Sequence, residues 1–527
     1  MKKLFYILIS LLLAFSIVFV FSCKKTGGGV TLKYNNGTEP ETLDPAVMSG
    51  HPEMMIAYQL FEGLVSYDSK ANPVPGVAEK WDVSEDKTVY TFHLRKNVKW
   101  SDGQPVTSDD FYFAWLRAMK SETGGDYAFL YWDYIKGAQD YADGKVTEAD
   151  VGLKVIDKYT FQVTLNAPTP YILDIFAFPT FMPVPKHVVE KVGNDTWFKK
   201  ENIVTNGAYL LKEWIPQQKI VMEKNKAYWD AKNVKVEILE FYAIEEATTA
   251  LEMYLNGELD ILNTVPTERI DEMKTRDDYH QVPEFATYYY IINVKANKAL
   301  ADVRVRKALA MAIDREYIVN YITKSGQIPA YSFVPEGLTG YKGPKFDKGD
   351  LDTARKLLAE AGYPNGKGFP KITILYNTSE GHRKIAEAIQ QMWSKELGIK
   401  VELLNQEWKV YLDSRDNHQF DVARAGWIGD YLDPKTFLDM FITGASFNNG
   451  QWSNPKYDKL VKAALNEFDV TKRYQLFAEA EKILLDEMPI IPIYYYSIVY
   501  MVKPYVKGYD DNLRDLHPFK YVYFEKK

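Results

Sequence analysis

The 527-residue sequence contains a single cysteine, Cys23, so no disulfide can form within the chain and apolar burial must hold the fold together. Its seven histidines are scattered without the spacing of a metal site, and we expect neither a metal nor another cofactor. The sequence also lacks the GxSxG, HExxH, GxxxxGK[ST] and GxGxxG motifs of common enzymes. These absences do not exclude catalysis, but they favour a binding function.

Runs of basic residues are missing as well, and the formal net charge is −7. An acidic balance of this kind argues against nucleic acid or anionic lipid as the main partner. Aromatic residues are abundant, at 14% of the chain with 38 tyrosines. Most of them should fill the cores of more than one domain, and the excess suits a binding surface made of stiff, amphipathic side chains.

The N-terminus has the layout of a secretory signal: two lysines, an apolar run over residues 4–21, and a serine directly before Cys23. A bacterial lipoprotein signal, residues 1–22, cleaved before Cys23 and lipidated on it, accounts for both the run and the lone cysteine, although Phe21 is bulky for such a site. An uncleaved membrane anchor is the alternative, because about 18 apolar residues are just long enough to span a bilayer. Either reading tethers the chain outside the cytoplasm, with residues 23–29 as a glycine-rich leash.

The first third of the chain reads as strands and turns. Alternating polar and apolar residues predict a half-buried strand over residues 89–95, and two further strands over residues 151–165 turn at Asp157 and Lys158. A helix should begin near Asp109 and run to Met119.

The second half predicts a parallel βαβ unit. An amphipathic helix over residues 351–361 ends at Gly362. Strands over residues 371–377 and 399–405 then flank a helix over 382–397, and a third strand covers 419–427. Because ligands bind outside the carboxyl ends of such strands, the loops 377–382, 405–415 and 424–430 should converge at one sheet edge.

The order of many sequence blocks is similar to that of the solute-binding proteins of bacterial peptide ABC importers, and most of all to their oligopeptide-binding members. The blocks span nearly the whole mature chain and include EPETLDP, LFEGLVSYD, TFHLRKNVKWSDGQPVTSDDF, NIVTNGAYLLKEW, DVRVRKALAMAIDR, YNTSEGHRK, NQEWKVYLDSR, FDVARAGWIGDY and PIIPIYYYSIVYMVKPYV.

The resemblance implies an α/β fold of the periplasmic-binding-protein type, class II or cluster C, in which two lobes close over a ligand by a hinge and an extra α/β domain is added. On that pattern, lobe I is discontinuous and comprises residues 30–61, 186–285 and 498–527. Residues 62–185 form the extra domain, and residues 286–497 form lobe II.

The resemblance also implies roles for charged residues. Asp430 matches the aspartate that binds the peptide ammonium, a strong charge-assisted contact. Arg424 and His382 match positions near the carboxylate end of short ligands, and Arg415 matches a nearby cation. A neutral histidine could not compensate charge, and an ordinary place at the start of a helix remains open for His382.

Other positions match walls of the family's site. Trp408 and Trp427 match pocket aromatics, and Tyr127 matches a tyrosine of the extra domain that faces the peptide backbone. Asn377 and Tyr289 are also expected to contact the peptide. Plain core packing stays an alternative for both tryptophans.

Two departures leave peptide length and charge preference open. Ser49 stands where the family has a glutamate, and a family lysine falls on Thr323 or Lys324. Neither residue is needed for a peptide to bind as an added strand. In the loop that carries Asp430, Gly426 and Gly429 should give room for close backbone approach.

The sequence therefore predicts an extracytoplasmic lipoprotein, expected to be monomeric, that captures short oligopeptides largely regardless of side chain and delivers them to an ABC permease. A receptor of the same family for dipeptides, murein peptide, nickel or haem is one alternative. A surface adhesin that reuses the fold is another, and a peptidase has the least support.

Overall fold

The computed structural model describes residues 29–525 except 339, 466 and 468. The predictions for the signal segment, for lipidation of Cys23 and for most of the leash lie outside the described residues. Within the described part, no helix combines the length and the apolar character that crossing a bilayer requires.

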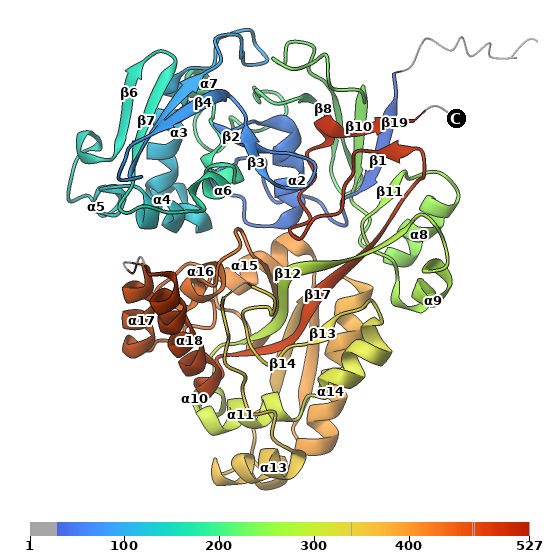
Figure 1. Ribbon diagram of the computed structural model, residues 1–527. Coiled ribbons are helices and arrows are strands. Elements are labelled where there is room, and N and C mark those ends of the chain that lie inside the picture. Colours follow the sequence, from blue (N-terminus) through green and yellow to red (C-terminus); the bar gives the residue numbers. More distant parts are fainter. Residues whose placement is uncertain (1–28, 339, 466, 468, 526–527) are drawn as a thin grey trace, which may run out of the picture.

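One large mixed sheet runs through the molecule and confirms the α/β class (Figure 1). Its order is β15-β14-β16-β12-β17-β11-β1-β10-β9-β8, and β13 (Ile328–Pro329) pairs with β17 beside this path. The strands are β15 (Val401–Gln406), β14 (Ile372–Asn377), β16 (Val422–Ile428), β12 (Tyr279–Ile292), β17 (Ile490–Val502), β11 (Ile261–Leu262), β1 (Thr31–Asn35), β10 (Ile238–Tyr242), β9 (Lys219–Lys224) and β8 (Tyr209–Ile215).

Two long strands connect the two parts of the molecule. β12 has 14 residues and β17 has 13, and they pair antiparallel from the upper part of Figure 1, which holds β1 and β8–β10, to the lower part, which holds β14–β16. Their β-branched and aromatic residues suit strands that are buried on both faces. The pairing register shifts between Pro283 and Thr287, so β12 bulges where the two parts meet.

The lower part contains the predicted βαβ unit. β14 pairs parallel with both β15 and β16, and α14 (Glu380–Leu397) makes the crossover. The helix starts two residues before the predicted position because the Ser379 side chain caps its N-terminus. It ends at Gly398, whose φ of 70° is the left-handed conformation expected of a glycine C-cap.

The upper part carries a second sheet of four antiparallel strands in the order β4-β5-β7-β6, made of Ala78–Val83, Val89–Leu94, Thr160–Thr164 and Leu153–Asp157. The predicted alternation of burial along β5 is confirmed. Helix α3 (Ser108–Met119) covers this sheet, and a capping box between Thr107 and Asp110 fixes its start. Its Trp115 packs edge-on against Phe161 and Phe181, with ring centroids 5.3 and 5.1 Å apart.

The remaining helices that position the cavity border the two parts. They are α2 (His51–Leu60), α4 (Phe129–Tyr134), α6 (Ile172–Phe176), α15 (Trp408–Asp416), α16 (Lys435–Leu438), α17 (Pro455–Leu465) and α18 (Val470–Glu487). Helices α11 (Val303–Met311) and α13 (Leu351–Glu360) pack in the lower part, away from the junction.

Candidate ligand-binding site

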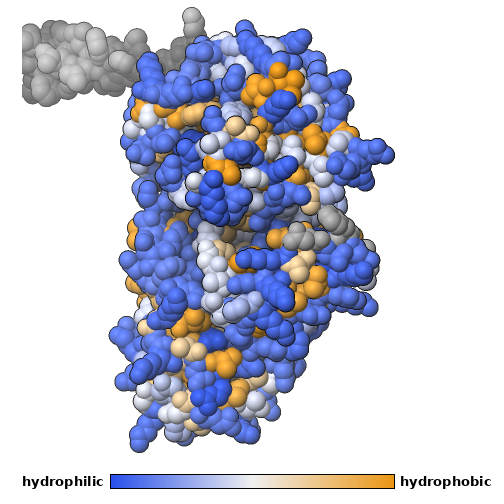
Figure 2. Space-filling view, turned by 90° about the vertical axis from the view of Figure 1, so that its left-hand side faces the viewer, coloured by the Kyte–Doolittle hydropathy of each residue, from blue (hydrophilic) through white to orange (hydrophobic). Residues whose placement is uncertain are grey.

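A cavity of about 310 Å³ lies where the upper and lower parts meet. Residues of α2, of the region around Tyr127, of the predicted loops 405–415 and 424–430 and of the C-terminal segment line it, whereas no residue of the predicted loop 377–382 does. Figure 2 shows that hydrophilic side chains predominate on one outer face of both parts, with smaller hydrophobic groups scattered among them. The lining includes Ser49, Gly50, His51, Tyr127, Phe178, Asn263, Glu284, Tyr289, Trp408, Arg415, Arg424, Gly426, Trp427, Ile428, Asp430, Phe447, Asn449, Tyr496, Ile498, Arg514 and Asp515.

The strand β16 presents a free edge to this cavity. Its pairing with β14 ends at Ala423, opposite Leu375. On the other side, Gly429 N–H donates to Phe285 O at 2.8 Å, so every second residue of this segment directs its backbone groups toward β12. The alternate residues Gly426 and Ile428 therefore direct theirs toward the free edge, where no described strand pairs with them. That edge can accept an extended chain.

Arg424 lies at the start of this edge as a cation without an acidic partner among the described residues. Its Nη2 donates to Tyr496 Oη at 2.7 Å, its Nη1 donates to Asn377 Oδ1 at 3.3 Å, and its guanidinium lies 4.8 Å from the centre of the Tyr288 ring. Burial alone would lower the pKa of Arg424, but Tyr496 and Tyr288 hold it above its usual value. The group is charged and poised for an anionic ligand group.

Two predicted contact residues, His382 and Asn377, stand behind Arg424 and do not line the cavity. Asn377 is connected to the cavity only indirectly, because its side chain accepts a hydrogen bond from the guanidinium group of Arg424. His382 Nδ1 lies 3.3 Å from Tyr288 Oη, and burial, followed by the nearby Arg424, holds the pKa of His382 well below its usual range. A neutral His382 orients Tyr288 beneath the cation.

The loop after β15 contributes Trp408 and Arg415 from the two ends of α15. Trp408 Nε1 donates to Glu53 Oε1 of α2 at 3.2 Å, so this tryptophan also joins the lower and upper parts. Arg415 Nε lies 3.4 Å from Asp416 Oδ1, and its guanidinium lies 5.8 Å from the centre of the Tyr411 ring. Both side chains line the cavity, as predicted.

Asp430 stands at the far end of the free edge from Arg424. Its Oδ2 accepts a hydrogen bond from Thr436 Oγ1 at 3.0 Å, and no described cationic side chain forms an ion pair with it. Burial, with a smaller contribution from Asp439, raises the pKa of Asp430 to about 7. A cation that entered here would find a carboxyl group ready to ionise.

An aromatic cluster forms one wall of the cavity. Trp427 lies 6.2 Å from Tyr127 and 4.8 Å from Phe447, measured between ring centroids, and its Nε1 donates to Thr436 Oγ1 at 3.3 Å. Tyr289 is 2% exposed and packs edge-on against Phe333 at 4.9 Å. The pocket-wall and core-packing interpretations therefore both apply, since these rings are packed and also border the cavity.

The departures from the family pattern have different positions. Ser49 lines the cavity. Thr323 donates to Gln327 Oε1 at 2.8 Å, Lys324 Nζ lies 4.0 Å from Asp271 Oδ2, and neither residue is part of the lining. The described side chains include no group of three or more metal-ligating residues placed to share an ion.

The charged or polar lining residues that the sequence reasoning missed include Glu284 of β12, Tyr496 of β17, and Arg514 and Asp515 of the C-terminal segment. They come from strands and a segment that cross between the two parts. An acid inside the otherwise apolar run of residues 282–286 was the available signal for Glu284.

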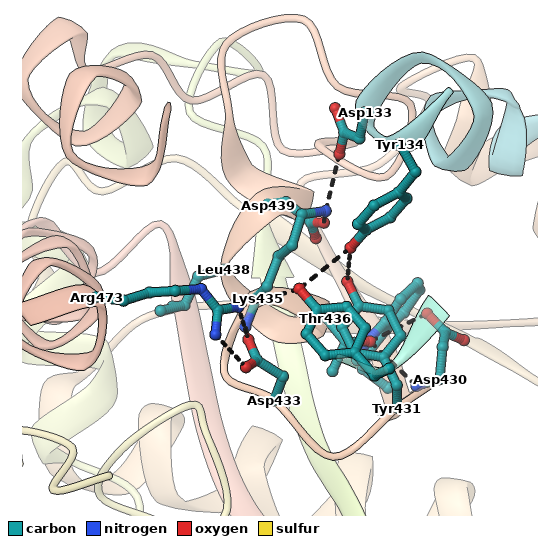
Figure 3. Close-up of polar contacts among 12 residues, drawn as sticks. Asp133, Tyr134, Asp430, Tyr431, Asp433, Lys435, Thr436, Leu438, Asp439 and Arg473 are labelled. Atoms are coloured by element: carbon teal, nitrogen blue, oxygen red, sulfur yellow. Dashed lines mark hydrogen bonds and ion pairs between the residues drawn. The ribbon is translucent and has the colours of Figure 1, made fainter. Parts of the chain in front are cut away.

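Beside Asp430, a polar network joins the upper and lower parts (Figure 3). Tyr134 Oη donates to Tyr431 Oη at 3.0 Å. Lys435, which is fully buried, reaches Asp133 of α4 at 2.8 Å and Asp439 at 2.5 Å. Arg473 of α18 lies 2.6 Å from Asp433. The contacts of Tyr134 and Asp133 require the two parts to be close together.

Comparisons with known proteins agree with this geometry. Residues 72–449 match the model of the bacterial extracellular solute-binding proteins, family 5. The chain is 42% identical over 489 residues to the periplasmic oligopeptide-binding protein OppA of Salmonella typhimurium, a match that covers 91% of this chain and 89% of that protein.

Among solved structures, OppA of Haemophilus influenzae in complex with RPPGFSPFR has a TM-score of 0.91 at 39% identity, with 94% of this chain and 99% of that one covered. The unliganded open form of the periplasmic murein tripeptide-binding protein MppA has a TM-score of only 0.63 at 38% identity, with coverage of 94% and 97%. The placement of the two parts is therefore closer to that of the peptide complex than to that of the open form.

Proposed function

The chain belongs to the bacterial extracellular solute-binding proteins of family 5, and we propose that it captures short peptides outside the cytoplasm and delivers them to an ABC permease. The relatives named as oligopeptide-binding proteins support this proposal. Receptor proteins of this family serve transport, which agrees with the absence of common catalytic motifs from the sequence.

The observation that carries the proposal is the unpaired edge of β16, with Asp430 at one end and Arg424 at the other. Every peptide offers the same three features: an ammonium group, a carboxylate and a repeating row of backbone amides. Asp430 would bind the ammonium, the backbone groups of Gly426 and Ile428 would pair with the peptide as with a neighbouring strand, and Arg424 with Arg415 would attract the carboxylate. None of these contacts depends on the peptide's side chains.

The surrounding aromatic residues would enclose the ligand without selecting it strongly. Trp408, Trp427, Tyr127 and Tyr289 offer flat, apolar surfaces that tolerate many side chains. His382 and Asn377 would act indirectly, by holding Tyr288 and Arg424 in place. Asp430 suits a ligand with a free amine, which favours peptides over nickel or haem as the solute.

Attachment to the membrane rests on the N-terminal sequence alone. The chain would be a monomer held at the membrane by a lipid on Cys23, and the leash would let the receptor reach its permease. We also propose the division into lobe I (30–61, 186–285 and 498–527), extra domain (62–185) and lobe II (286–497). The separate four-stranded sheet within residues 78–164 and the two crossing strands support it.

Native mass spectrometry of the purified protein would test the function, with gentle release so that co-purified ligand survives. A spread of bound masses that fits short peptides is the expected result, and it would also give the range of peptide lengths. A single bound mass that fits no peptide would overturn the proposal. If the protein is empty, titration with a peptide library must detect binding, and failure of every peptide would overturn the proposal as well.

A further inference from the structure

One carboxylic acid in the cavity has no hydrogen-bond or ion-pair partner among the described residues. Glu284 lies on β12 at the bulge where the two parts meet, and it lines the cavity while being only 6% exposed. Within the described part of the chain, its carboxyl group takes part in no hydrogen bond and no ion pair. A buried acid in this state is unfavourable unless something else satisfies it.

No described cationic side chain forms an ion pair with Glu284. Burial, and then the nearby carboxylate of Asp515, raise the pKa of Glu284 well above its usual range. Burial raises the pKa of Tyr496 as well, and the negative charge of Glu284 adds to that rise, which places Glu284 near the tyrosine that holds Arg424. Arg424 itself uses its Nη atoms for Tyr496 and Asn377.

The other acids and one arginine around the cavity are already engaged. Asp515 is paired with His517 Nε2 at 2.9 Å and with His51 Nε2 at 3.3 Å. Arg514 Nη1 is paired with Asp174 Oδ1 at 2.9 Å. Asp430 accepts from Thr436 and, under the proposed function, receives the α-ammonium of the peptide. Of the acids in the described lining, only Glu284 is left without a partner. The ammonium group and the carboxylate of a peptide main chain are already assigned to other residues, so the main chain offers no group for Glu284.

We propose that Glu284 is a specificity residue that selects peptides with a cationic side chain, a lysine or an arginine, at the position that reaches the bulge of β12. This inference rests on the proposed peptide-binding function and adds a preference to it. The ammonium or guanidinium group would donate to the Glu284 carboxylate, and the nearby Asp515 would strengthen the attraction through its negative charge. The receptor is then not indifferent to every side chain.

The contact with Glu284 should distinguish one peptide side chain from another, which main-chain recognition does not. A norleucine side chain has the same apolar stem as lysine but cannot supply a charge, so it would leave the carboxyl group of Glu284 unsatisfied. One charge-assisted contact in a desolvated site corresponds to an affinity difference on the order of tenfold to a hundredfold. Peptides without a cationic side chain would still bind through Asp430, Arg424 and the strand edge.

Calorimetric titration with short alanine peptides would test this, with lysine or norleucine placed at one position at a time. We expect the wild type to bind the lysine peptide at least about tenfold more tightly at one position. Glu284→Gln should abolish that difference and leave the norleucine affinities unchanged. Asp430→Asn, the matched control, should weaken lysine and norleucine peptides to the same extent.

Three results would overturn the proposal: a wild type with no lysine preference at any position, a preference that survives in Glu284→Gln, or an equal loss for all peptides in Glu284→Gln, which would make Glu284 a main-chain contact. Thermal unfolding of Glu284→Gln and of Glu284→Met would establish that each variant is folded. Failure of every peptide to bind the wild type would instead refute the peptide-binding function itself.

Discussion

The rings of Tyr171 and Tyr431 lie parallel, 4.4 Å between centroids and at 4° to each other, across the junction between the upper and lower parts. Tyr431 directly follows Asp430, and its hydroxyl also accepts from Tyr134. Tyr431, beside the proposed ammonium site, therefore makes contacts that exist only while the two parts are together. The proposed ammonium site and this contact between the two parts therefore lie on one loop.

Substitution of Tyr431 should shift the balance between open and closed forms. Tyr431→Leu removes the stacked ring and the hydroxyl contact, which together correspond to about 1–2 kcal/mol. Small-angle scattering should show a larger radius of gyration without peptide, and peptide affinity should fall several-fold. Tyr431→Phe keeps the ring and should lie between the wild type and Tyr431→Leu. Equal scattering and affinity for all three proteins would contradict this role.

Removal of Lys435 should destabilise the protein because it leaves two acids without their cation. Asp439 has only 3% of its side chain exposed, and burial already raises its pKa to about 6 despite the opposing effect of Lys435. We expect Lys435→Met to lower the free energy of unfolding in urea at pH 7.5 by on the order of 3 kcal/mol. The double variant Lys435→Met with Asp439→Leu should recover much of the loss. An unchanged midpoint in the single variant would show that the buried cluster contributes nothing.

Replacement of Asp430 tests the ammonium site. Asp430→Ala should weaken binding of peptides with a free amine by on the order of tenfold to a hundredfold, because a buried charge partner is lost. The variant should be no less stable than the wild type, since the carboxyl group has only Thr436 as a side-chain partner among the described residues. N-acetylated peptides should bind the wild type weakly and lose little more in the variant. Wild-type affinity in Asp430→Ala would refute the assignment.

The raised pKa of Asp430 predicts that peptide affinity falls as the solution becomes more acidic. Its folded-state pKa of about 7 lies above the ordinary value of 3.8, so the empty folded protein holds a proton that the unfolded chain has lost. This group therefore lowers stability as the pH rises from about 4 to 7, whereas a bound ammonium favours the ionised form. Affinity should rise up to about tenfold per pH unit toward pH 7 and level off above it.

Titration calorimetry at pH 5.5, 6.5 and 7.5 would measure the pH effect. Because Glu284 also titrates in the cavity, the peptide should carry only alanine side chains. Asp430→Asn should bind more weakly at every pH and lose most of the slope. A wild-type affinity that does not vary over this range would contradict the prediction.

The two glycines of the Asp430 loop should differ in what they tolerate. A Cβ at Gly429 would lie 2.4 Å from Phe285 Cδ1 and 3.1 Å from Phe437 Cε2, so Gly429→Ala should cost about 1–3 kcal/mol of unfolding free energy through overpacking. A Cβ at Gly426 would lie 2.5 Å from Tyr496 Oη, the end of a side chain that holds Arg424. Gly426→Ala should reduce peptide affinity more than stability. The reverse pattern in unfolding and binding assays would contradict this distinction.

Local sequence signals predicted the part of the site that lies at the carboxyl ends of the strands. The βαβ pattern and the rule on carboxyl strand ends placed Trp408, Arg415, Arg424, Trp427 and Asp430 around one cavity, as the structure confirms. The space expected at Gly429 for a ligand is instead limited by packed aromatic rings. Periodicity gives the face of a residue in its own strand, and it does not give the side chains that fill the opposite side.

The rest depended on contacts between distant segments. His382 was predicted at the end of the loop 377–382, but α14 already begins at Glu380, and His382 contacts Tyr288 instead of lining the cavity. Glu284 enters the cavity because β12 bulges between Pro283 and Thr287, and a bulge arises from the register with β17, which no local pattern reveals. Arg514 reaches the site only because the C-terminal segment returns to the junction.

The free edge of β16 also carries a hazard. Backbone groups that accept any peptide can equally accept a strand from a misfolded protein or from another copy of this chain. Closure covers the edge, so an empty receptor that has opened is the form most exposed to aggregation. A bound peptide would then also protect the receptor against aggregation. When peptides are scarce, more of the receptor would be open and more prone to aggregate.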